Sequence, residues 1–495
     1  MLAAVVLTAA AAMRGAEYDE QYTLFLTGGV ARPIWPVTPF LAGEVRTLQS
    51  GHAGLREIAR DLRATDVHPP LYFWAVALWR RVVGGDLFAA RMFSVGCGLA
   101  ALVAVGAIAR SAGIPPALAM LLTLGCYGFT YTGSIARGFA LAEALTLAGV
   151  ALVLAARGRG MAFVGGVLLG AATLANYLAV FVAVAALCAL SWPALLALGG
   201  KGVDGRRPCA AACGFVLALP LDFWFFHAQR GSRTGQFPPF DMLDSLHRLA
   251  RYAAANLFGG LPLYVPDAAR PLVSASLAAL ACLLAGLVAI RWRYLSAPVP
   301  RRLLASAAIA PPLGLLALGV AFHTTPVELR YLASATPFAA LLLAGALASL
   351  PCRTRNAILA VVLIVQAAAI VGLSTRPETM QPARATAAAA AGLVEDGVVL
   401  VPRGNDGVGI VGAFAIESPP SLRLMVVDRD ESPEQILRRV GPAHRVVLAL
   451  MAQDDASRAT LPVLLATFAP PCWRQVADGF NVRAYDSACG VEAPR

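Results

Sequence analysis

The sequence predicts a mainly α-helical, polytopic membrane helix bundle of about 11 spans, followed by a C-terminal extracytoplasmic α/β domain. The first observation is composition: 58% of the 495 residues are hydrophobic and 14% are charged, whereas soluble domains carry about 25% charged residues. The second is the mean hydropathy of +0.68. The third is a change near residue 375, after which charged residues become frequent. A soluble globule of this length could not bury so much apolar surface, and a disordered chain would be far more polar.

The candidate membrane spans are delimited by length, by gaps between charges and by Gly/Pro breaks. A span needs about 20 apolar residues, or fewer where the helix starts inside the protein. The candidates are residues 1–13, 88–109, 115–133, 136–156, 161–176, 177–199, 208–226, 271–290, 303–322, 331–350 and 356–374. The first is short and lacks a basic leading segment, so a cleaved signal peptide and a truncated first helix both stay open. Residues 1–374 form the predicted membrane domain.

Basic residues in short loops orient the chain, because cytoplasmic loops carry an excess of Lys and Arg. The short basic loops contain Arg110, Arg157, Arg159, Lys201, Arg206, Arg207, Arg291, Arg293, Arg301, Arg302, Arg353 and Arg355. They alternate correctly if the N-terminus is cytoplasmic and residues 14–87, 227–270 and 375–495 lie outside. With their single acid, Asp204, these twelve basic residues account for the net charge of +11, so the basic balance reports topology and not a nucleic-acid partner.

Residues 68–84 test this orientation, because counting them as a span would reverse every later loop. We therefore interpret them as a juxtamembrane helix on the outer surface, with Trp74 and Trp79 at the interface.

Residues 375–495 alternate short strand-like runs with helical ones, which is typical of a small α/β domain. The predicted strands are 398–401, 422–427, 446–450 and 482–485, and the predicted helices are 381–394, 432–440 and 456–468. Cys472 and Cys489 flank a hairpin-like stretch, and whether they form a disulfide stays open. No Cys/His spacing matches a zinc site.

The first candidate site is the adjacent pair Asp19 and Glu20, just outside the first span. Neighbouring carboxylates point in different directions on a helix, so one can face a cavity as a general base while the scaffold holds the other. The alternative is two solvated acids in a polar loop.

Further candidates share the predicted outer level of the membrane. His68 precedes two prolines that fix a rigid entry to the next helix, and it could bind a phosphate or serve a structural role. Other polar groups predicted at this level are Arg137, Asn176, Tyr177, Asp222, Glu328 and Arg330. Two arginines there would suit a lipid-linked phosphate. Taken one at a time, these charges are explained about as well by ion pairs such as Glu328–Arg330, or by snorkelling at helix ends, as by a phosphate site.

Residues 407–412 match the G-x-G-x-x-G pattern, with Asp428 at the end of the next strand. Dinucleotide binding by an oxidoreductase is a weak hypothesis, because residues 404–406 intervene after the strand and the domain is predicted outside the membrane. Tight turns and close packing explain the glycines more simply.

Together these motifs resemble the polyprenol-phosphate-sugar glycosyltransferases of the GT-C fold. The most similar branch is the family-39-like enzymes, which include protein mannosyltransferases, aminoarabinose transferases and lipopolysaccharide-core sugar transferases. The motifs that carry the resemblance are Asp19-Glu20, His68-Pro69-Pro70-Leu71-Tyr72, Phe88 to Ser94 with Arg91, Ser134 to Ala140 with Arg137, Asn176-Tyr177 and Arg330-Tyr331-Leu332. Asn176 stands where many members have His, which puts the role of that position in doubt.

The resemblance implies a multi-pass enzyme of the bacterial cytoplasmic (inner) membrane that moves a sugar, with inversion, from a polyprenyl-phosphate donor to an unidentified outer acceptor. Asp19 would be the general base, with Glu20 beside it. Arg137 and Arg330 would stabilise the departing lipid phosphate, with His68, Asn176 and Tyr177 near the donor. No cofactor is expected, although a divalent metal between the carboxylates stays open. The alternative is a multi-span carrier or flippase, but such proteins more often show paired halves and charges near the midplane.

Overall fold

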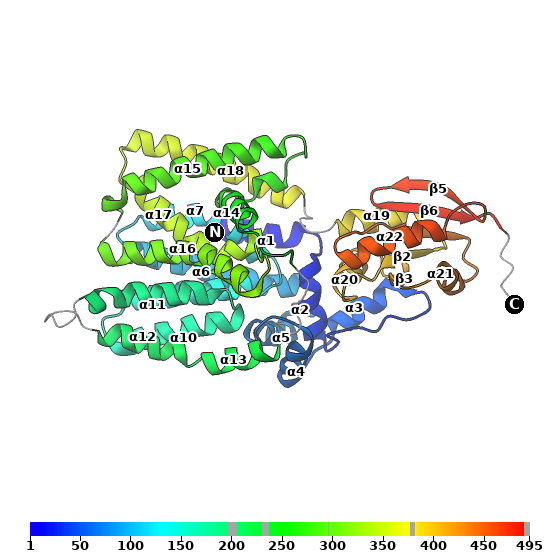
Figure 1. Cartoon of the computed structure of the whole chain (residues 1–495), viewed down its shortest axis with the longest axis horizontal. Coiled ribbons are helices and arrows are strands. Elements are labelled where there is room, and N and C mark those ends of the chain that lie inside the picture. The colour runs from blue at the N-terminus through cyan, green and yellow to red at the C-terminus, as the bar shows by residue number, and fades with distance from the viewer. Residues whose placement is uncertain (197–204, 230–236, 296, 377–381, 490–495) are drawn as a thin grey trace. The chain divides into compact units, whose positions relative to one another are not determined.

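The computed structural model describes residues 1–196, 205–229, 237–295, 297–376 and 382–489 (Figure 1). The chain divides into two compact units. The helical unit comprises Met1–Met13, Leu62–Ala75 and Arg91–Arg376, and the α/β unit comprises Arg14–Asp61, Val76–Ala90 and Pro377–Arg495. The predicted loop residue Lys201 and the end of the predicted span 177–199 lie outside the described residues.

The helical unit consists mainly of helices, and three of them, α4, α5 and α6, extend into the α/β unit. The elements are α1 (Leu2–Met13), α4 (Leu55–Thr65), α5 (Leu71–Val83), α6 (Leu87–Ser111), α7 (Pro116–Leu124), α8 (Tyr127–Thr130), η1 (Thr132–Ser134), α9 (Phe139–Ala155), α10 (Arg159–Ala175), α11 (Ala179–Leu196), α12 (Arg206–Val216), α13 (Leu219–Ala228), α14 (Met242–Leu257), η3 (Leu261–Leu263), α15 (Arg270–Ile290), η4 (Trp292–Tyr294), α16 (Pro298–Phe322), η5 (Leu329–Ala335), α17 (Thr336–Ala348) and α18 (Cys352–Thr375).

The chain is a multi-pass membrane protein. Among the described residues, six helical stretches are long and apolar enough to cross a membrane: Leu87–Ser111, Arg206–Ala228, Arg270–Ile290, Pro298–Phe322, Leu329–Ala348 and Cys352–Thr375. Four shorter apolar helices are Leu2–Met13, Phe139–Ala155, Arg159–Ala175 and Ala179–Trp192. The predicted span 115–133 is broken into α7, α8 and η1. The count of 11 spans therefore stays a prediction.

Burial of these helices differs in a way that a bilayer explains. Only 11% of the apolar window of α15 is buried within the protein, against 72% for the window of Leu329–Ala348. Leu272, Leu283 and Ile290 of α15 are each more than two thirds exposed. Water would penalise such a surface, so lipid is the solvent that fits it.

Glycines let neighbouring helices of this unit approach closely. A Cβ atom on Gly166 of α10 would lie 1.9 Å from the carbonyl oxygen of Ala211 in α12. One on Gly149 of α9 would lie 2.8 Å from the carbonyl oxygen of Gly165. Small residues at crossings are the usual means by which membrane helices pack, because van der Waals contact replaces the hydrophobic effect there.

The α/β unit contains a six-stranded sheet in the order β1-β3-β2-β4-β6-β5. Its strands are β1 (Phe40–Leu41), β2 (Val398–Pro402), β3 (Arg423–Val427), β4 (Arg445–Ala449), β5 (Trp473–Gly479) and β6 (Val482–Ser487). Strand β2 pairs in parallel with β3 and β4, and the other pairings are antiparallel. The predicted strands therefore form, and β1 adds an edge strand from the N-terminal region that the sequence did not predict.

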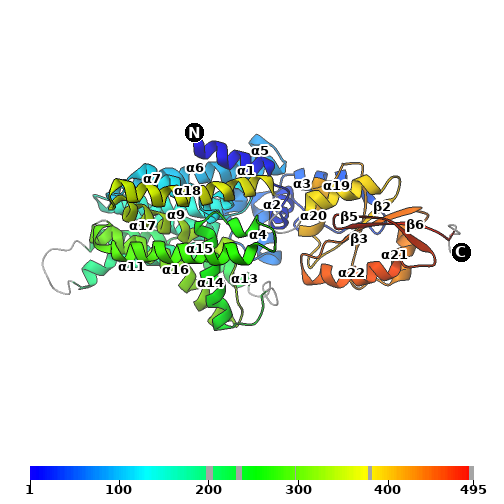
Figure 2. The ribbon, with the colours of Figure 1, turned by 90° about the horizontal axis from the view of Figure 1, so that it is seen from above.

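Helices cover both faces of this sheet (Figure 2). Helices α19 (Ala383–Leu393) and α20 (Gly409–Glu417) pack on the face that contains Val399 and Val401. Helices α21 (Pro433–Val440) and α22 (Asp455–Thr467) pack on the face that contains Val398 and Leu400. Every residue of β2 is buried, as expected for a parallel strand covered on both sides. The three helices predicted in this region are confirmed.

Helix α2 (Tyr18–Gly28), followed by α3 (Ala42–Ser50), packs against α20 and explains the glycine motif. A Cβ atom on Gly409 would lie 2.4 Å from the ring of Tyr18, and Gly407 has a φ of 70°. The N-terminal turn of α20 is thus occupied by a side chain of the same unit. The interpretation of these glycines as turn and packing residues is confirmed.

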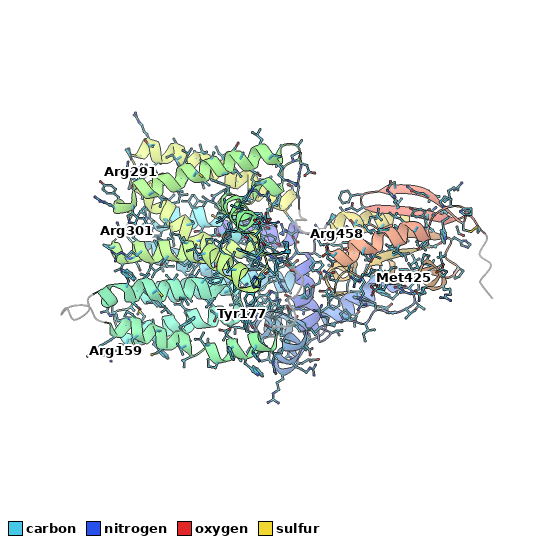
Figure 3. The ribbon with its side chains drawn as sticks, in the orientation of Figure 1. Arg159, Tyr177, Arg291, Arg301, Met425 and Arg458 are labelled. Carbon is cyan, nitrogen blue, oxygen red and sulfur yellow. A yellow bond between two sulfur atoms is a disulfide. The ribbon has the colours of Figure 1, made fainter. Side chains whose placement is uncertain are left out.

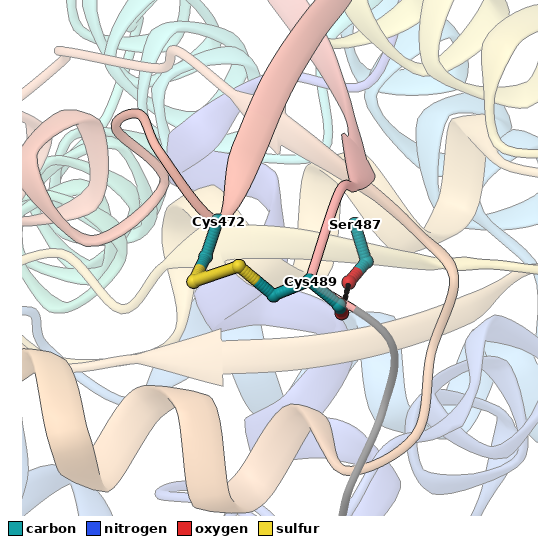
Figure 4. The surroundings of a disulfide bond; sticks show 3 residues. All are labelled: Cys472, Ser487 and Cys489. Atoms are coloured by element: carbon teal, nitrogen blue, oxygen red, sulfur yellow. Dashed lines mark hydrogen bonds between the residues drawn. A yellow bond between two sulfur atoms is a disulfide. The ribbon is translucent and has the colours of Figure 1, made fainter.

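Cys472, before β5, and Cys489, after β6, form a disulfide with a Cα–Cα distance of 4.8 Å (Figure 4). The hydroxyl of Ser487 donates to the carbonyl oxygen of Cys489 at 2.8 Å. The bond closes the open end of the β5–β6 hairpin. Disulfides persist mainly in oxidising compartments.

Candidate functional site

Three charged or ionisable side chains form a linear chain in the helical unit. The Nδ1 atom of His68 lies 2.8 Å from Oδ1 of Asp66, and its Nε2 atom lies 2.9 Å from Nη2 of Arg137. Asp66 and His68 belong to the segment between α4 and α5, and Arg137 precedes α9. Asp66 and Arg137 are buried, while 28% of the His68 side chain is exposed. The imidazole is therefore the accessible member of the chain.

The hydrogen bonds fix the protonation pattern of this chain. A guanidinium can only donate, so Nε2 of His68 accepts from Arg137 and the ring proton resides on Nδ1, which donates to Asp66. Burial by itself would raise the pKa of Asp66. The contacts with His68 and the charge of Arg137 outweigh burial and hold the pKa of Asp66 below its ordinary value. Asp66 is thus an anion that orients His68, and His68 in turn holds the guanidinium of Arg137.

Gly138 sets the position of Arg137. A Cβ atom at Gly138 would lie 2.5 Å from the carbonyl oxygen of Ala175 and 3.4 Å from Cβ of Tyr72. The backbone at Gly138 therefore contacts the end of α10 and the start of α5 so closely that no side chain fits there. This contact leaves little room for the arginine to shift along the chain.

Tyr177 joins the same network through Gln229. The hydroxyl of Tyr177 donates to Oε1 of Gln229 at 3.0 Å. The Nε2 atom of Gln229 donates to the carbonyl oxygens of His68 at 2.9 Å and Leu62 at 3.1 Å. Gln229 is 3% exposed, so it is a rigid link between the α10–α11 turn and the His68 segment.

Asn176 lies in the turn between α10 and α11, and its Oδ1 atom accepts from the backbone N–H of Leu178 at 3.0 Å. This contact closes an Asx turn, which is a common role for Asn. It also places the neighbouring Tyr177 for its bond to Gln229.

Arg330 lies in η5, which packs beside α9. Its Nη2 atom lies 2.6 Å from Oε2 of Glu328, and its guanidinium lies 5.6 Å from the ring centroid of Tyr331. The ring of Tyr331 stacks on that of Phe139, two residues after Arg137, with centroids 6.4 Å apart. The aromatic pair connects the surroundings of the two arginines.

Labelled residues in Figure 3 lie toward opposite ends of the helical unit. Arg159, Arg291 and Arg301, all in predicted cytoplasmic loops, lie at one end, and Tyr177 lies toward the opposite end. This separation agrees with the predicted alternation of the loops. Which end faces the cytoplasm stays a prediction.

Asp19 and Glu20 belong to the α/β unit, in the first turn of α2. Glu20 is fully buried, and its Oε2 atom accepts from the backbone N–H of Glu17 at 3.0 Å, which forms half of a capping box. Asp19 is half-buried. The two acids thus have different surroundings, as expected from their adjacent positions on a helix.

Sequence reasoning missed Asp66 and Gln229. Asp66 is two residues before His68, and a carboxylate so close to a candidate His is a signal that could have found it. Gln229 is uncharged and lies in a polar loop, so only its contacts reveal it. Within the described residues, no group of three or more His, Cys, Asp or Glu side chains could hold a metal ion. The absence of a cofactor stays a prediction.

Comparisons with known proteins bear on the fold. No protein-family model matches the sequence, and no characterised protein matches it by sequence. Among solved structures, the chain is similar to ArnT from Cupriavidus metallidurans bound to undecaprenyl phosphate, with 14% identity, a TM-score of 0.55, and coverage of 100% of this chain and 98% of ArnT. The apo state of ArnT gives the same TM-score and identity, with coverage of 98% and 96%.

The oligosaccharyltransferase of Archaeoglobus fulgidus is more distant, with 12% identity, a TM-score of 0.44, and coverage of 76% of this chain and 55% of that protein. The likeness to ArnT extends over both units of the chain, and it confirms the predicted GT-C fold.

Proposed function

We propose that the chain is a membrane glycosyltransferase that transfers a sugar, with inversion, from a polyprenyl-phosphate donor to an acceptor outside the cytoplasm. The observation that carries the proposal is the Asp66–His68–Arg137 chain, which holds a buried guanidinium behind an accessible imidazole. The full-length likeness to ArnT, which was solved with undecaprenyl phosphate, supports the donor class.

The reaction would be a single displacement at the anomeric carbon of the sugar. An acceptor hydroxyl gives its proton to Asp19 as its oxygen forms the new glycosidic bond. The bond between the anomeric carbon and the phosphate oxygen breaks, and polyprenyl phosphate leaves. Arg137 and Arg330 bind the phosphate oxygens as negative charge grows on them, since guanidinium groups make charge-assisted, bidentate contacts with phosphate.

The other candidate residues would position these groups. Asp66 and His68 would hold Arg137, and Glu20 would fix the first turn of α2 on which Asp19 lies. Asn176 would shape the α10–α11 turn, and Tyr177 would hold that turn beside the His68 segment through its hydrogen bond to Gln229. The outer location is supported by the Cys472–Cys489 disulfide, which suits a bacterial chain segment exported across the inner membrane.

The experiment that tests this proposal is turnover of a panel of radiolabelled undecaprenyl-phosphate hexoses and pentoses in bacterial membranes that carry the protein and supply its acceptor. Arg137→Ala, Arg330→Ala and Asp19→Asn should each lower turnover by about 10²-fold or more. Arg159→Ala, at the opposite end of the helical unit (Figure 3), is the matched control and should leave turnover unchanged.

Full activity of the Asp19→Asn variant at normal expression would show that the base is wrongly assigned. If no donor supports transfer but proteoliposomes of the protein move a lipid-linked sugar across the bilayer, the carrier or flippase alternative would replace the enzyme.

A further inference from the structure

The α/β unit contains a cavity of about 790 Å³ that the proposed transfer reaction does not use. It lies beyond the carboxyl ends of β2 and β3, where Arg403 and Asp428 follow the two strands. Residues 32–37, which we call the strap, form one side of it, and α21 forms another. Such a volume falls in the range that small ligands occupy.

The topology of the sheet explains why a cavity forms there. The chain leaves β2 toward α20 on one face of the sheet and leaves β3 toward α21 on the other face. The two outgoing loops therefore diverge and leave a crevice between them. In open α/β sheets, ligands characteristically bind in crevices of this kind at the carboxyl ends of the strands.

The strap is held rigidly in place. Nε of Arg439 donates to the carbonyl oxygen of Val37 at 2.7 Å, and its Nη2 donates to that of Val426 in β3 at 2.8 Å. The indole of Trp35 stacks on Phe40 with ring centroids 5.6 Å apart, and its Nε1 donates to the carbonyl oxygen of Gly407 at 2.8 Å. A ligand therefore meets a wall that is already ordered, which lowers the entropic cost of binding.

Guanidinium–carboxylate pairs line the cavity. Arg403 lies 2.7 Å from Asp428, and both side chains keep a third to a half of their surface exposed. The other pairs are Arg32–Asp406 and Arg439–Glu431. A sugar hydroxyl both donates and accepts a hydrogen bond, so adjacent hydroxyls can bind the carboxylate and the guanidinium of one pair together.

Arg438 gives the cavity its charge preference. It is exposed on α21 and lines the cavity, whereas the acid that it attracts, Glu434 of the same helix, does not line it. The three acids of the cavity are already matched by Arg32, Arg403 and Arg439. Among the lining residues, the arginines therefore outnumber the acids by one, and that one is Arg438.

We propose that this cavity binds an acidic saccharide, a sugar chain that carries a carboxylate or phosphate group. The paired side chains contact its hydroxyls, and Arg438 contacts its anionic group. The lining contains none of the residues proposed for sugar transfer, and the site gives the α/β unit a binding role of its own.

The test is binding of saccharides to the full-length protein in phosphatidylcholine nanodiscs, measured by calorimetry without any donor. The probes are tetragalacturonate, a phosphorylated disaccharide, uncharged maltotetraose and inorganic phosphate. One or both of the acidic saccharides should bind at one site per chain, at least 10-fold more tightly than maltotetraose or phosphate. Whichever of the two binds shows whether the anionic group is a carboxylate or a phosphate.

Arg438→Glu and Arg403→Ala should each weaken that binding at least 10-fold, while Arg458→Ala, which removes an exposed arginine of α22 in the same unit (Figure 3), should not. Equal binding of maltotetraose would overturn the charge preference, and equal binding of phosphate would overturn the saccharide. Binding that both cavity variants retain, or no saturable binding at all, would overturn the site. Because no donor is present, none of these outcomes depends on the transfer reaction.

Discussion

Two charged clusters, one in each unit, serve different purposes. In the helical unit, Asp66 and Arg137 are buried and joined through one histidine. In the α/β unit, pairs such as Arg403–Asp428 and Arg458–Asp455 stay largely exposed. A buried charge without its partner is costly, whereas an exposed pair contributes little to stability. The Asp66–His68–Arg137 chain therefore fixes geometry, whereas pairs such as Arg403–Asp428 leave charges available to bind other molecules.

Removing one partner from each kind of pair tests this contrast most directly. Asp66→Ala leaves the buried Arg137 without its carboxylate and should lower the free energy of unfolding by about 3–5 kcal/mol. Asp455→Ala, the matched change in the exposed Arg458 pair, should have little effect. Denaturant unfolding of the protein in nanodiscs measures both, and similar losses in the two variants would refute the contrast.

The disulfide should stabilise one unit alone. Cys472→Ser combined with Cys489→Ser opens a loop of 17 residues, which in the chain-entropy treatment costs about 3 kcal/mol. Hydrogen exchange should show lost protection in β5, β6 and β4 and unchanged protection in α9 and α10. Equal loss of protection in those two helices would mean that the units unfold as one.

Close-packed glycines offer a matched comparison within each unit. Gly409→Ala should destabilise the α/β unit by about 1–3 kcal/mol because the new Cβ meets the Tyr18 ring. Gly392→Ala, on an open face of α19, should stabilise it slightly.

In the helical unit, Gly166→Ala should destabilise, and Gly286→Ala, with nothing within 4 Å, should not. Thermal unfolding of the four variants checks the order, and a neutral Gly166→Ala would contradict the close helix crossing.

Acid should lower the stability of the helical unit by protonating Asp66. Its pKa is lower in the folded protein than in the unfolded chain, so its contribution is complete above the unfolded value of about 4. That contribution disappears as the pH falls through the folded value. The difference in unfolding free energy between the native protein and Asp66→Asn should be constant from pH 7 to about pH 4.5 and shrink below it. A difference that grows on acidification would have the wrong sign.

Features that depend on local pattern were predictable from the sequence, and those that depend on distant contacts were not. The buried strands β2, β3 and β4 are largely apolar runs, His68 stands out before two prolines and a predicted juxtamembrane helix, and Arg137 stands out at the start of a predicted span. Strand β1 has two residues, too few for any periodicity, and it exists only because β3 offers an edge. Gln229 shows its role only through bonds to residues that are far away in the sequence.

The division of the chain into units has a consequence for its biogenesis. The polypeptide passes between the helical and α/β units five times, and Asp19 lies on a helix whose packing partner, α20, begins at Gly409. During synthesis nearly the whole chain must therefore be made before α2 can pack on α20. A protein shortened after residue 375 would keep its membrane helices yet deprive α2 of α20, which packs on it alongside α3, so the C-terminal region is a late-arriving scaffold for a helix near the start of the chain.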